Sequence, residues 1–502
     1  MSSPIRTPAD VAPGAGIPYA FARTHGVLAS RREGDAIVVL LRPDATIDGI
    51  AELRRVLNRP LVTREVSADA FATELARAYN QAGAALAMSE SLASEADLSR
   101  LMQELPTSED LLDADAQAPV IRMINALLLQ ALRERASDLH FEPYEARAVV
   151  RFRVDGMLHD ALSPPRALHG ALVSRLKIMA GLDIAEKRLP QDGRIALKLG
   201  DRQVDVRVST LPTGAGERVV LRLLDQDAAR LDLSTLGMSD ETLAAVDRLI
   251  REPHGILLVT GPTGSGKTTT LYAALSRLPR DTTNMMTVED PIEYALDGVA
   301  QTQVSPRIDL TFARALRSIL RQDPDVIMIG EIRDLETAQI AVQASLTGHL
   351  VLATLHTNDA ASAITRLADM GVEPYLLASS LLGVLAQRLV RTLCPACRMS
   401  TSASDGERRL LHDLGLPETS RVWSAPGCDA CNRSGFAGRT GVYELLRIDD
   451  ALRRLIHDGA GELALRDAAL RSGMRRLRED GARWIAQGQT SLAELTRVTR
   501  DG

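Results

Sequence analysis

Residues 256–268 read Ile-Leu-Leu-Val-Thr-Gly-Pro-Thr-Gly-Ser-Gly-Lys-Thr, and this stretch decides the fold. Its first four residues, Ile256 to Val259, form the short apolar run expected of a buried strand in a parallel sheet. The glycines that follow allow unusual backbone angles and a close approach to a phosphate. Backbone N–H groups and the positive end of the next helix would then face that phosphate. The stretch therefore predicts an α/β fold that binds a nucleoside triphosphate.

Eight consecutive residues form the candidate phosphate-binding loop: Gly261, Pro262, Thr263, Gly264, Ser265, Gly266, Lys267 and Thr268. In this pattern the lysine, Lys267, reaches the β- and γ-phosphates, and the hydroxyl of Thr268 holds Mg²⁺. A chance glycine-rich turn is the alternative, but the complete pattern between a strand and a helix argues against it. We therefore expect an enzyme that uses ATP and Mg²⁺.

The composition indicates a globular protein of several domains. A chain of 502 residues suggests about three domains, and a hydrophobic content of 45% is ample for their cores. The net charge of −6 argues against wholesale binding to nucleic acid or to anionic membranes. We find no secretory signal and no run of about 18 apolar residues. We expect a cytosolic protein that contacts a membrane through a partner.

Changes in composition along the chain predict five segments. They are a small α/β N-terminal docking domain over residues 1–81, a linker over 82–117, an α+β middle domain over 118–225, a second linker over 226–238, and an ATPase domain over 239–502. Within the first, residues 1–16 look flexible, 36–41 predict a strand, and 47–57 and 67–79 predict helices. The ATPase domain would include a cysteine module at about 388–440 and C-terminal helices over 441–502.

In the middle domain, apolar spacing predicts a helix over residues 120–135, ended by Ser137 and Asp138. Strands are then expected over residues 140–143, 148–154, 157–162, 194–199, 204–211 and 218–224. The loop of the last hairpin would be residues 212–216.

The apolar residues of that last hairpin predict its register. Matching the apolar faces places Val208 opposite Leu221 and Val206 opposite Leu223, which sets Arg207 directly opposite Arg222. Two opposed cations are destabilising unless an anion lies between or beside them. The pair is therefore either two solvated surface arginines or a site for the γ-phosphate of a nucleotide.

Three further apolar runs of the ATPase domain end in polar residues, at the edge of a parallel sheet where ligands bind. Glu289 ends the first run, followed by Asp290 and Glu293. The second ends in Gly-Glu where the common pattern has Asp, so Glu331 could orient or deprotonate the attacking water, or help to hold hydrated Mg²⁺. The third run ends in His356. A lone histidine there would be structural, but the polar ends of the other two runs, beside one phosphate loop, favour a role in the site. Further cations near this edge, some of them potential arginine fingers, are Arg314, Arg317, Arg321 and Arg333.

The four cysteines form two Cys-x-x-Cys pairs, Cys394 with Cys397 and Cys428 with Cys431. Four thiolates can complete a tetrahedral zinc site with no open position for water, which makes the expected Zn²⁺ structural. Disulfides are the alternative, disfavoured in the cytosol. A zinc ribbon that binds nucleic acid is another, but residues 394–441 contain six Lys/Arg and five Asp/Glu, a balance that argues against phosphate binding.

These motifs resemble, in order, those of the type II and type IV secretion ATPase superfamily. Gly261–Thr268, Val288–Glu293, Ile329–Asp334 and Gly348–His356 resemble its Walker A motif, Asp box, variant Walker B motif and His box. Arg207 and Arg222 resemble the family's arginine pair, and the four cysteines its zinc module. Residues 111–120 and 136–142 resemble its middle-domain opening. Residues 17–26 look more like the type II secretion member, general secretory pathway protein E, than like the pilus-assembly member.

The resemblance implies a homohexamer of RecA-like ATPase domains that does mechanical work on an inner-membrane assembly. It implies a cytoplasmic protein, peripheral to the inner membrane, whose N-terminal domain docks on the cytoplasmic domain of a membrane secretion protein and which acts on an inner-membrane platform protein. Pseudopilus assembly for protein export is the implied task, with no nucleic-acid partner. Catalysis would involve Glu331, Glu289, His356 and the arginine pair. The alternatives are a type IV pilus extension ATPase, a hexameric nucleic-acid motor, and a nucleotide-binding scaffold without turnover.

Overall fold

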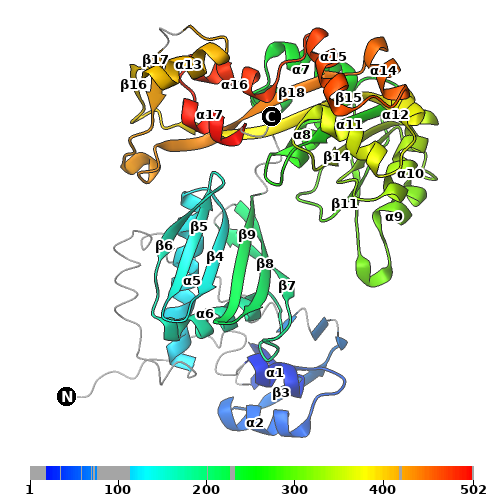
Figure 1. Cartoon of the computed structure of the whole chain (residues 1–502). Coiled ribbons are helices and arrows are strands. Elements are labelled where there is room, and N and C mark those ends of the chain that lie inside the picture. The colour runs from blue at the N-terminus through cyan, green and yellow to red at the C-terminus, as the bar shows by residue number, and fades with distance from the viewer. Residues whose placement is uncertain are drawn as a thin grey trace. The chain divides into compact units, whose positions relative to one another are not determined.

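The computed structural model in Figure 1 describes residues 19–33, 36–57, 59–68, 70–71, 74–75, 114–199, 202–225, 232–417 and 421–499. The chain divides into two compact units, residues 1–227 and 228–502. The flexible start expected over residues 1–16 and most of the linker expected over 82–117 lie outside the described residues.

The N-terminal part of the first unit contains a three-stranded sheet, and its described residues include helices α1 Tyr19–His25 and α2 Ile47–Leu57. The strands of the sheet are β1 Val27–Glu33, β2 Ala36–Leu41 and β3 Leu61–Glu65. β2 pairs antiparallel with β1 and parallel with β3. The strand predicted over 36–41 and the helix predicted over 47–57 are confirmed with the same bounds. The helix predicted over 67–79 lies largely outside the described residues.

The rest of the first unit is an antiparallel six-stranded sheet in the order β6-β5-β4-β9-β8-β7. Its strands are β4 Ala136–Pro143, β5 Ala148–Val154, β6 Met157–Leu162, β7 Gln191–Leu199, β8 Arg202–Thr213 and β9 Gly216–Asp225. Helices α5 Ala114–Arg133 and α6 His169–Met179 pack with it in one core (Figure 1). Leu139 and Phe141 of β4 face this core, so the alternating residues Asp138, His140 and Glu142 lie on the other face.

Several predicted boundaries in this unit are wrong. Helix α5 begins at Ala114, inside the predicted linker, and ends at Arg133. Its first turn is polar and Ala-rich, so the apolar spacing used for the prediction does not include it. Helix α6 was not predicted. β4 begins at Ala136 and includes the residues expected to separate the helix from the strand. The hairpin between β8 and β9 turns on two residues, 214 and 215, rather than five, so both strands are longer than predicted.

The second unit is built on a seven-stranded sheet in the order β12-β11-β13-β14-β10-β15-β18. Its strands are β10 Gly255–Thr260, β11 Met285–Glu289, β12 Ala300–Gln303, β13 Val326–Ile329, β14 Leu350–Leu355, β15 Leu381–Leu393 and β18 Phe436–Arg447. All neighbours pair in parallel except β15 and β18. The predicted α/β fold is confirmed, and the carboxyl ends of β10, β11, β13 and β14 meet at one edge of the sheet.

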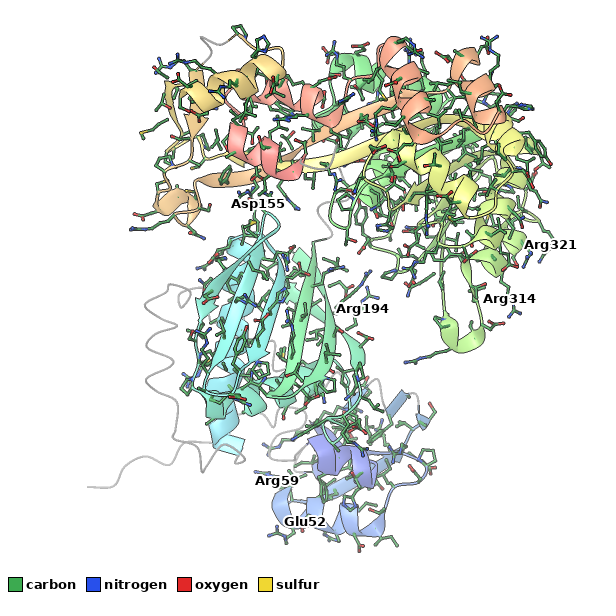
Figure 2. All side chains as sticks on the ribbon, viewed as in Figure 1. Glu52, Arg59, Asp155, Arg194, Arg314 and Arg321 are labelled. Carbon is green, nitrogen blue, oxygen red and sulfur yellow. The ribbon has the colours of Figure 1, made fainter. Side chains whose placement is uncertain are left out.

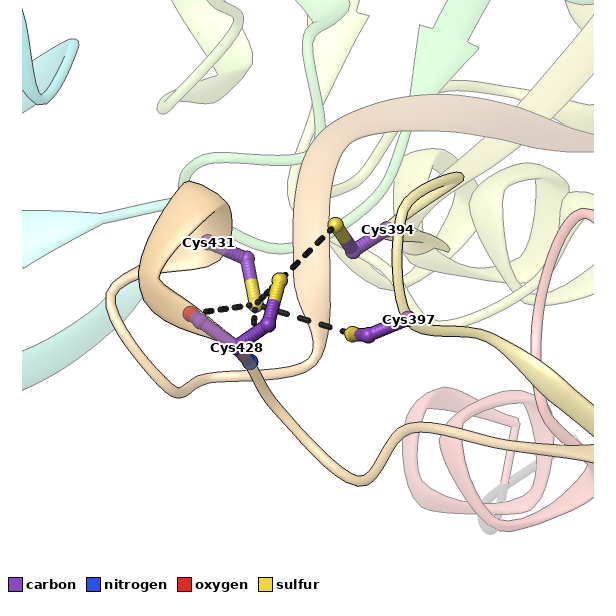
Figure 3. A group of neighbouring side chains, drawn as sticks. All are labelled: Cys394, Cys397, Cys428 and Cys431. Atoms are coloured by element: carbon purple, nitrogen blue, oxygen red, sulfur yellow. Dashed lines mark hydrogen bonds between the residues drawn. The ribbon is translucent and has the colours of Figure 1, made fainter.

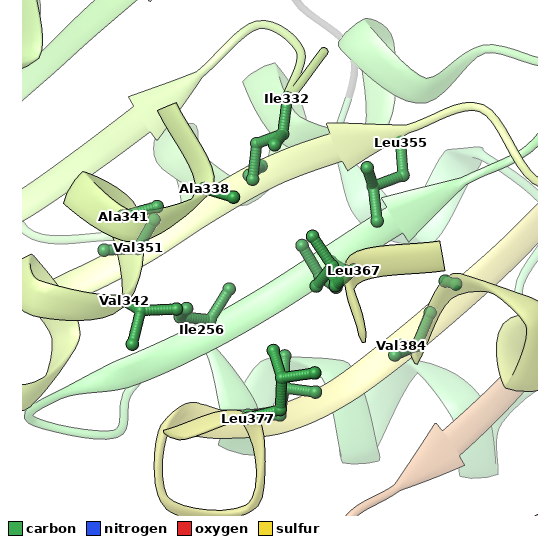
Figure 4. Close-up of a cluster of buried hydrophobic side chains, with 14 of the residues drawn as sticks. Ile256, Ile332, Ala338, Ala341, Val342, Val351, Leu355, Leu367, Leu377 and Val384 are labelled. Atoms are coloured by element: carbon green, nitrogen blue, oxygen red, sulfur yellow. The ribbon is translucent and has the colours of Figure 1, made fainter. Parts of the chain in front are cut away.

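Helices cover both faces of this sheet. On one side, residues of α9 Phe312–Ile319, α10 Leu335–Leu346, α11 Ala360–Asp369, α12 Pro374–Ser380, α14 Asp450–His457 and α15 Glu462–Arg471 join the core. Figure 4 shows part of it, with Ile256 of β10 among side chains such as Val342 and Leu367. On the other side pack α7 Asp240–Leu249 and α8 Lys267–Ser276. Burial on both faces explains why β10 is apolar along most of its length.

The cysteine module is smaller than predicted. It contains β16 Met399–Ser402, α13 Asp405–Asp413 and β17 Arg421–Ser424, whereas residues 388–393 and 436–440 belong to the long strands β15 and β18. β18 continues to Arg447, so the C-terminal helices begin at Asp450 rather than near 441. The last two, α16 Leu477–Ala486 and α17 Leu492–Val498, pack with the module in a separate apolar core. Among the described residues, every helix is too short or too polar to cross a membrane.

Candidate functional site

The candidate phosphate-binding loop lies between β10 and α8, which is the position predicted for it. Gly261 and Gly266 have φ angles of +147° and +87°, which favour glycine. A Cβ at position 261 would overlap the carbonyl oxygen of Gln387, and one at position 266 would lie 2.8 Å from the Gln387 amide nitrogen. Both glycines therefore allow the loop to lie directly against β15.

Lys267 is buried at the first position of α8. Its Nζ donates to the carbonyl oxygens of Gly261 at 2.8 Å and Pro262 at 3.1 Å. Burial lowers the pKa of Lys267 to about 8; Glu331 opposes this shift and Arg388 adds to it. The lysine charge is thus retained at neutral pH in a loop where a phosphate would stabilise it.

The loop residues fit a nucleotide phosphate in a second way. The hydroxyl of Ser265 is buried, and among the described residues it has no hydrogen-bond partner. A buried hydroxyl without a partner costs free energy that a phosphate oxygen would offset. A phosphate here would face a buried cation, an available hydroxyl donor and the N-terminus of α8.

Glu331 and His356 come together at the carboxyl edge of the sheet, after β13 and β14. His356 Nε2 lies 3.5 Å from Glu331 Oε2, and the Glu331 carboxylate also contacts the guanidinium of Arg333. The Glu331 side chain is 14% exposed, enough to meet a water molecule. Burial, followed by the nearby charge of Lys267, lowers the pKa of His356, so this ring is neutral at pH 7.

Glu289 lies at the end of β11 and is buried. Its carboxylate accepts hydrogen bonds from Thr287 Oγ1 at 2.7 Å and Gln301 Nε2 at 3.0 Å, and it contacts the hydroxyl of Tyr272 on α8. Burial first, and this carboxylate second, raise the pKa of Tyr272 well above its usual value. Glu289 thus ties the helix of the phosphate loop to β11, which the sequence pattern does not indicate.

The four further arginines are held by local acceptors. Arg314 donates to Asp309 at 2.6 Å, Arg317 contacts Glu336, and Arg321 donates to the carbonyl of Arg317 at 2.7 Å. Figure 2 shows Arg314 and Arg321 at the periphery of their unit. Of these four arginines, Arg333 is the one whose contact described here is with a predicted catalytic residue, Glu331.

Gln387 supports the phosphate loop and was missed by sequence reasoning. It is 2% exposed on β15, its side-chain oxygen accepts from Thr270 Oγ1 at 2.7 Å, and it lies against Gly261 and Gly266. A signal was present, because Gln387 is a polar residue within the apolar run of residues 381–390. A buried polar residue in such a run is satisfied by a specific partner.

The predicted register of the arginine pair is confirmed. Arg207 lies directly opposite Arg222, between the pairs Val208 with Leu221 and Val206 with Leu223. Arg222 Nε donates to Asp138 Oδ1 at 3.1 Å. The sequence pattern missed this acid, because Asp138 was interpreted as part of a break between helix and strand.

The four cysteines form one cluster, shown in Figure 3. Their sulfurs lie within 4.8 Å of one another, with 4.0 Å between Cys394 and Cys428, 3.8 Å between Cys397 and Cys431, and 3.7 Å between Cys428 and Cys431. Four sulfurs around a tetrahedral Zn²⁺ are about 3.8 Å apart. All four thiols are free rather than paired in disulfides.

Backbone donors prepare this cluster for a cation. The N–H groups of Cys428 and Gly435 each lie 3.2 Å from the sulfur of Cys431. Although burial opposes the charged form, these bonds lower the pKa of Cys431 to about 7. Cys431 can therefore be a thiolate at neutral pH, whereas burial raises the pKa of Cys428 and raises that of Cys397 to about 12. A bound cation would favour the charged form of all four thiols.

Two protein families match the chain. Residues 113–497 match the family described as Type II/IV secretion system protein, and residues 16–79 match the family of an N-terminal domain of GSPII protein E. The chain is 60% identical to Type II secretion system protein HxcR of Pseudomonas aeruginosa, over 97% of this chain and 99% of that protein. It is 52% identical to Type II secretion system ATPase E of Vibrio cholerae, over 97% of both.

Two solved structures share the fold. The Legionella pneumophila ATPase DotB has a TM-score of 0.55 and 21% identity, covering 76% of this chain and 96% of DotB. The pilus retraction motor PilT with bound ADP has a TM-score of 0.51 and 26% identity, covering 75% of this chain and 96% of PilT. These similarities show that the α/β fold of this chain is shared with an ATPase and with a pilus retraction motor.

Proposed function

Because the chain belongs to the type II secretion protein E family of secretion ATPases, we propose that it is the hexameric ATPase that drives pseudopilus assembly in type II secretion. The full-length similarity to type II secretion proteins carries this proposal. It favours protein export over the alternative of type IV pilus extension. The phosphate loop with its buried Lys267, beside Glu331, supplies the chemistry that such a motor needs.

In the proposed reaction, Lys267 and the loop N–H groups bind the phosphates, and Thr268 holds Mg²⁺. When bound, this ion neutralises charge that develops on the transferred phosphoryl group. Glu331 positions the attacking water, and the neutral ring of His356 helps to orient Glu331. Glu289 acts on this site indirectly, by fixing Tyr272 of α8. Arg207 and Arg222 close on the γ-phosphate and release it after hydrolysis, which couples chemistry to motion.

The partners are part of the same proposal. The N-terminal region that matches the domain of GSPII protein E docks on the cytoplasmic domain of an inner-membrane secretion protein. The hexamer lies in the cytoplasm, peripheral to the inner membrane, and works on a platform protein within it. Nucleic acid has no place in this scheme, since the net charge is −6 and the cysteine module is balanced in charge.

The cysteine cluster binds one structural Zn²⁺ in this proposal, with Cys394, Cys397, Cys428 and Cys431 as ligands. The sulfur separations and the N–H groups at Cys431 support it. Four thiolate ligands close the coordination sphere, so the ion holds β15 and β18 together at the module rather than taking part in hydrolysis.

We expect about one zinc per chain. Replacing Cys394 and Cys397 by Ser should destabilise the chain by at least about 3 kcal/mol, because structural zinc supplies folding free energy. ATP binding should survive, since the phosphate loop belongs to a different apolar core. Mass spectrometry of anaerobically purified protein measures the metal, and a zinc-free chain of wild-type stability would contradict the assignment.

The proposed function is tested in cells that lack the chromosomal copy of this chain. Full-length wild type should restore export of secreted enzymes, and Lys267→Ala should not, although both proteins are recovered with the inner-membrane fraction. Purified wild type should hydrolyse ATP faster with the cytoplasmic domain of the membrane partner and lipid vesicles. Restored pilus extension without export would favour the pilus alternative, and stimulation by nucleic acid would favour a nucleic-acid motor.

A further inference from the structure

One face of the six-stranded sheet carries a transverse row of arginines. The strand register places Arg194 opposite Arg207, and Arg207 opposite Arg222. From Arg222 the row continues to Asp138 and then to Arg153. Opposed residues project from the same face of a sheet. Asp138 is therefore the one acid in a row of five residues.

Asp138 is buried and holds one edge of the Arg222 guanidinium. The side chain of Asp138 is 8% exposed, whereas that of Arg222 is 55% exposed. Arg222 Nε donates to Oδ1 at 3.1 Å, and Ser137 Oγ donates to Oδ2 at 2.7 Å. Each carboxylate oxygen thus has a donor, and the carboxylate is fixed in orientation.

Asp138 is hydrogen-bonded to Arg222 rather than to its other cross-strand neighbour, Arg153. The register between β4 and β5 shifts at Ser137, and such irregularities commonly change the direction of a side chain. Arg153 lies farther from Asp138, at 3.7 Å, and donates to the carbonyl of Gly156 at 3.0 Å. The main bond of Asp138 to a cation is therefore the one to Arg222.

We propose that Asp138 is a positioning residue that fixes the guanidinium of Arg222 for the γ-phosphate, a proposal that rests on the proposed function. A guanidinium has five N–H donors. Asp138 occupies the one at Nε and leaves the two terminal nitrogens of the exposed group to bind phosphate. The fixed side chain does not have to be ordered when the nucleotide arrives, so binding at the transition state costs less entropy.

The charge of Asp138 also makes the arginine pair possible. Arg207 and Arg222 face each other directly, and like charges in that position destabilise a sheet. A buried carboxylate beside Arg222 offsets part of this repulsion while leaving the outer face of the pair positive. Without the carboxylate, Arg222 would turn away from Arg207.

The first test is the turnover of full-length Asp138→Ala, measured at protein concentrations where activity per chain has reached its plateau. We expect kcat to fall by about 10², the loss typical of a misplaced catalytic group. KM for ATP and the affinity for fluorescent ATP should stay at the wild-type values, which a general loss of structure would not allow. Asp138→Asn keeps an acceptor for Nε and should lose less, about tenfold.

A double variant separates positioning from a structural role. In the Arg222→Gln background, Asp138→Ala should lower turnover no further, because the residue it positions is gone. Asp205→Ala is the matched control: Asp205 lies on the same sheet face, its side chain is also 8% exposed, and it contacts Nε of Arg194. This control should keep turnover within about twofold of wild type.

Each result of these experiments either supports or overturns the positioning role of Asp138. Wild-type turnover in Asp138→Ala, with Arg222→Gln inactive, overturns the positioning role but keeps the proposed function of the arginine pair. A further loss from Asp138→Ala in the Arg222→Gln background also overturns it. If the Arg222→Gln variant itself hydrolyses ATP normally, the arginine pair takes no part in the reaction. The positioning role of Asp138 is then overturned as well. If Asp138→Ala does not fold, Asp138→Asn provides the same comparison.

Discussion

A chain with Glu331→Gln should bind ATP with wild-type affinity and hydrolyse it slower by a factor on the order of 10³, within the range for loss of acid–base catalysis. The glutamine keeps the size of the side chain but cannot accept a proton or orient water through a charge. Binding should persist, because Lys267 is held in the loop by the carbonyls of Gly261 and Pro262 rather than by Glu331. Fluorescent ATP titration and a steady-state phosphate assay measure the two quantities.

The matched variant Lys267→Ala should lose binding and turnover together. Its ammonium contacts phosphate in the ground state as well as in the transition state, so both are weakened. The Ala variant also leaves the carbonyls of the loop without their donor. If the Glu331 and Lys267 variants lost ATP affinity equally, this result would contradict the proposal that Glu331 acts on the attacking water.

Local patterns in the sequence predicted much of this site because they record which face of a strand is buried. The alternation of Val206, Val208, Leu221 and Leu223 gave the register of the hairpin and so the opposition of the two arginines. The apolar runs around residues 286, 326 and 350 became the parallel strands β11, β13 and β14. Each of these features depends on residues close together in the chain.

The remaining features depend on strand order, which no local pattern contains. Gln387 supports the phosphate loop only because β15 lies next to β10 in the sheet. Glu289 contacts Tyr272 only because α8 packs near the end of β11, and this contact buries a carboxylate that looked available for catalysis. Asp138 reaches Arg222 only because β4 pairs with β9. Contacts between strands distant in sequence need a topology, which a single sequence does not supply.

Replacing Arg207 or Arg222 by Gln should lower turnover by a factor on the order of 10³ or more, as for an arginine finger. ATP binding should survive, because Lys267 and the loop N–H groups hold the phosphates without this pair. The two losses should be less than additive, since removal of one cation already spoils a shared site. Single-turnover hydrolysis and ATP titration of both single variants and the double variant measure these effects.

Arg194→Gln is the control for this experiment, because Arg194 lies opposite Arg207 on the same face and its side chain is 71% exposed. If all three arginines are surface charges, each substitution should change the free energy of unfolding by no more than about 0.5 kcal/mol and leave turnover intact. The proposal instead requires that the control behaves in this way while the pair does not. Normal ATP hydrolysis by the Arg207→Gln variant would show that the six-stranded sheet takes no part in the reaction. Loss of the γ-phosphate could then no longer release that sheet, and the proposed coupling of hydrolysis to motion would need another contact.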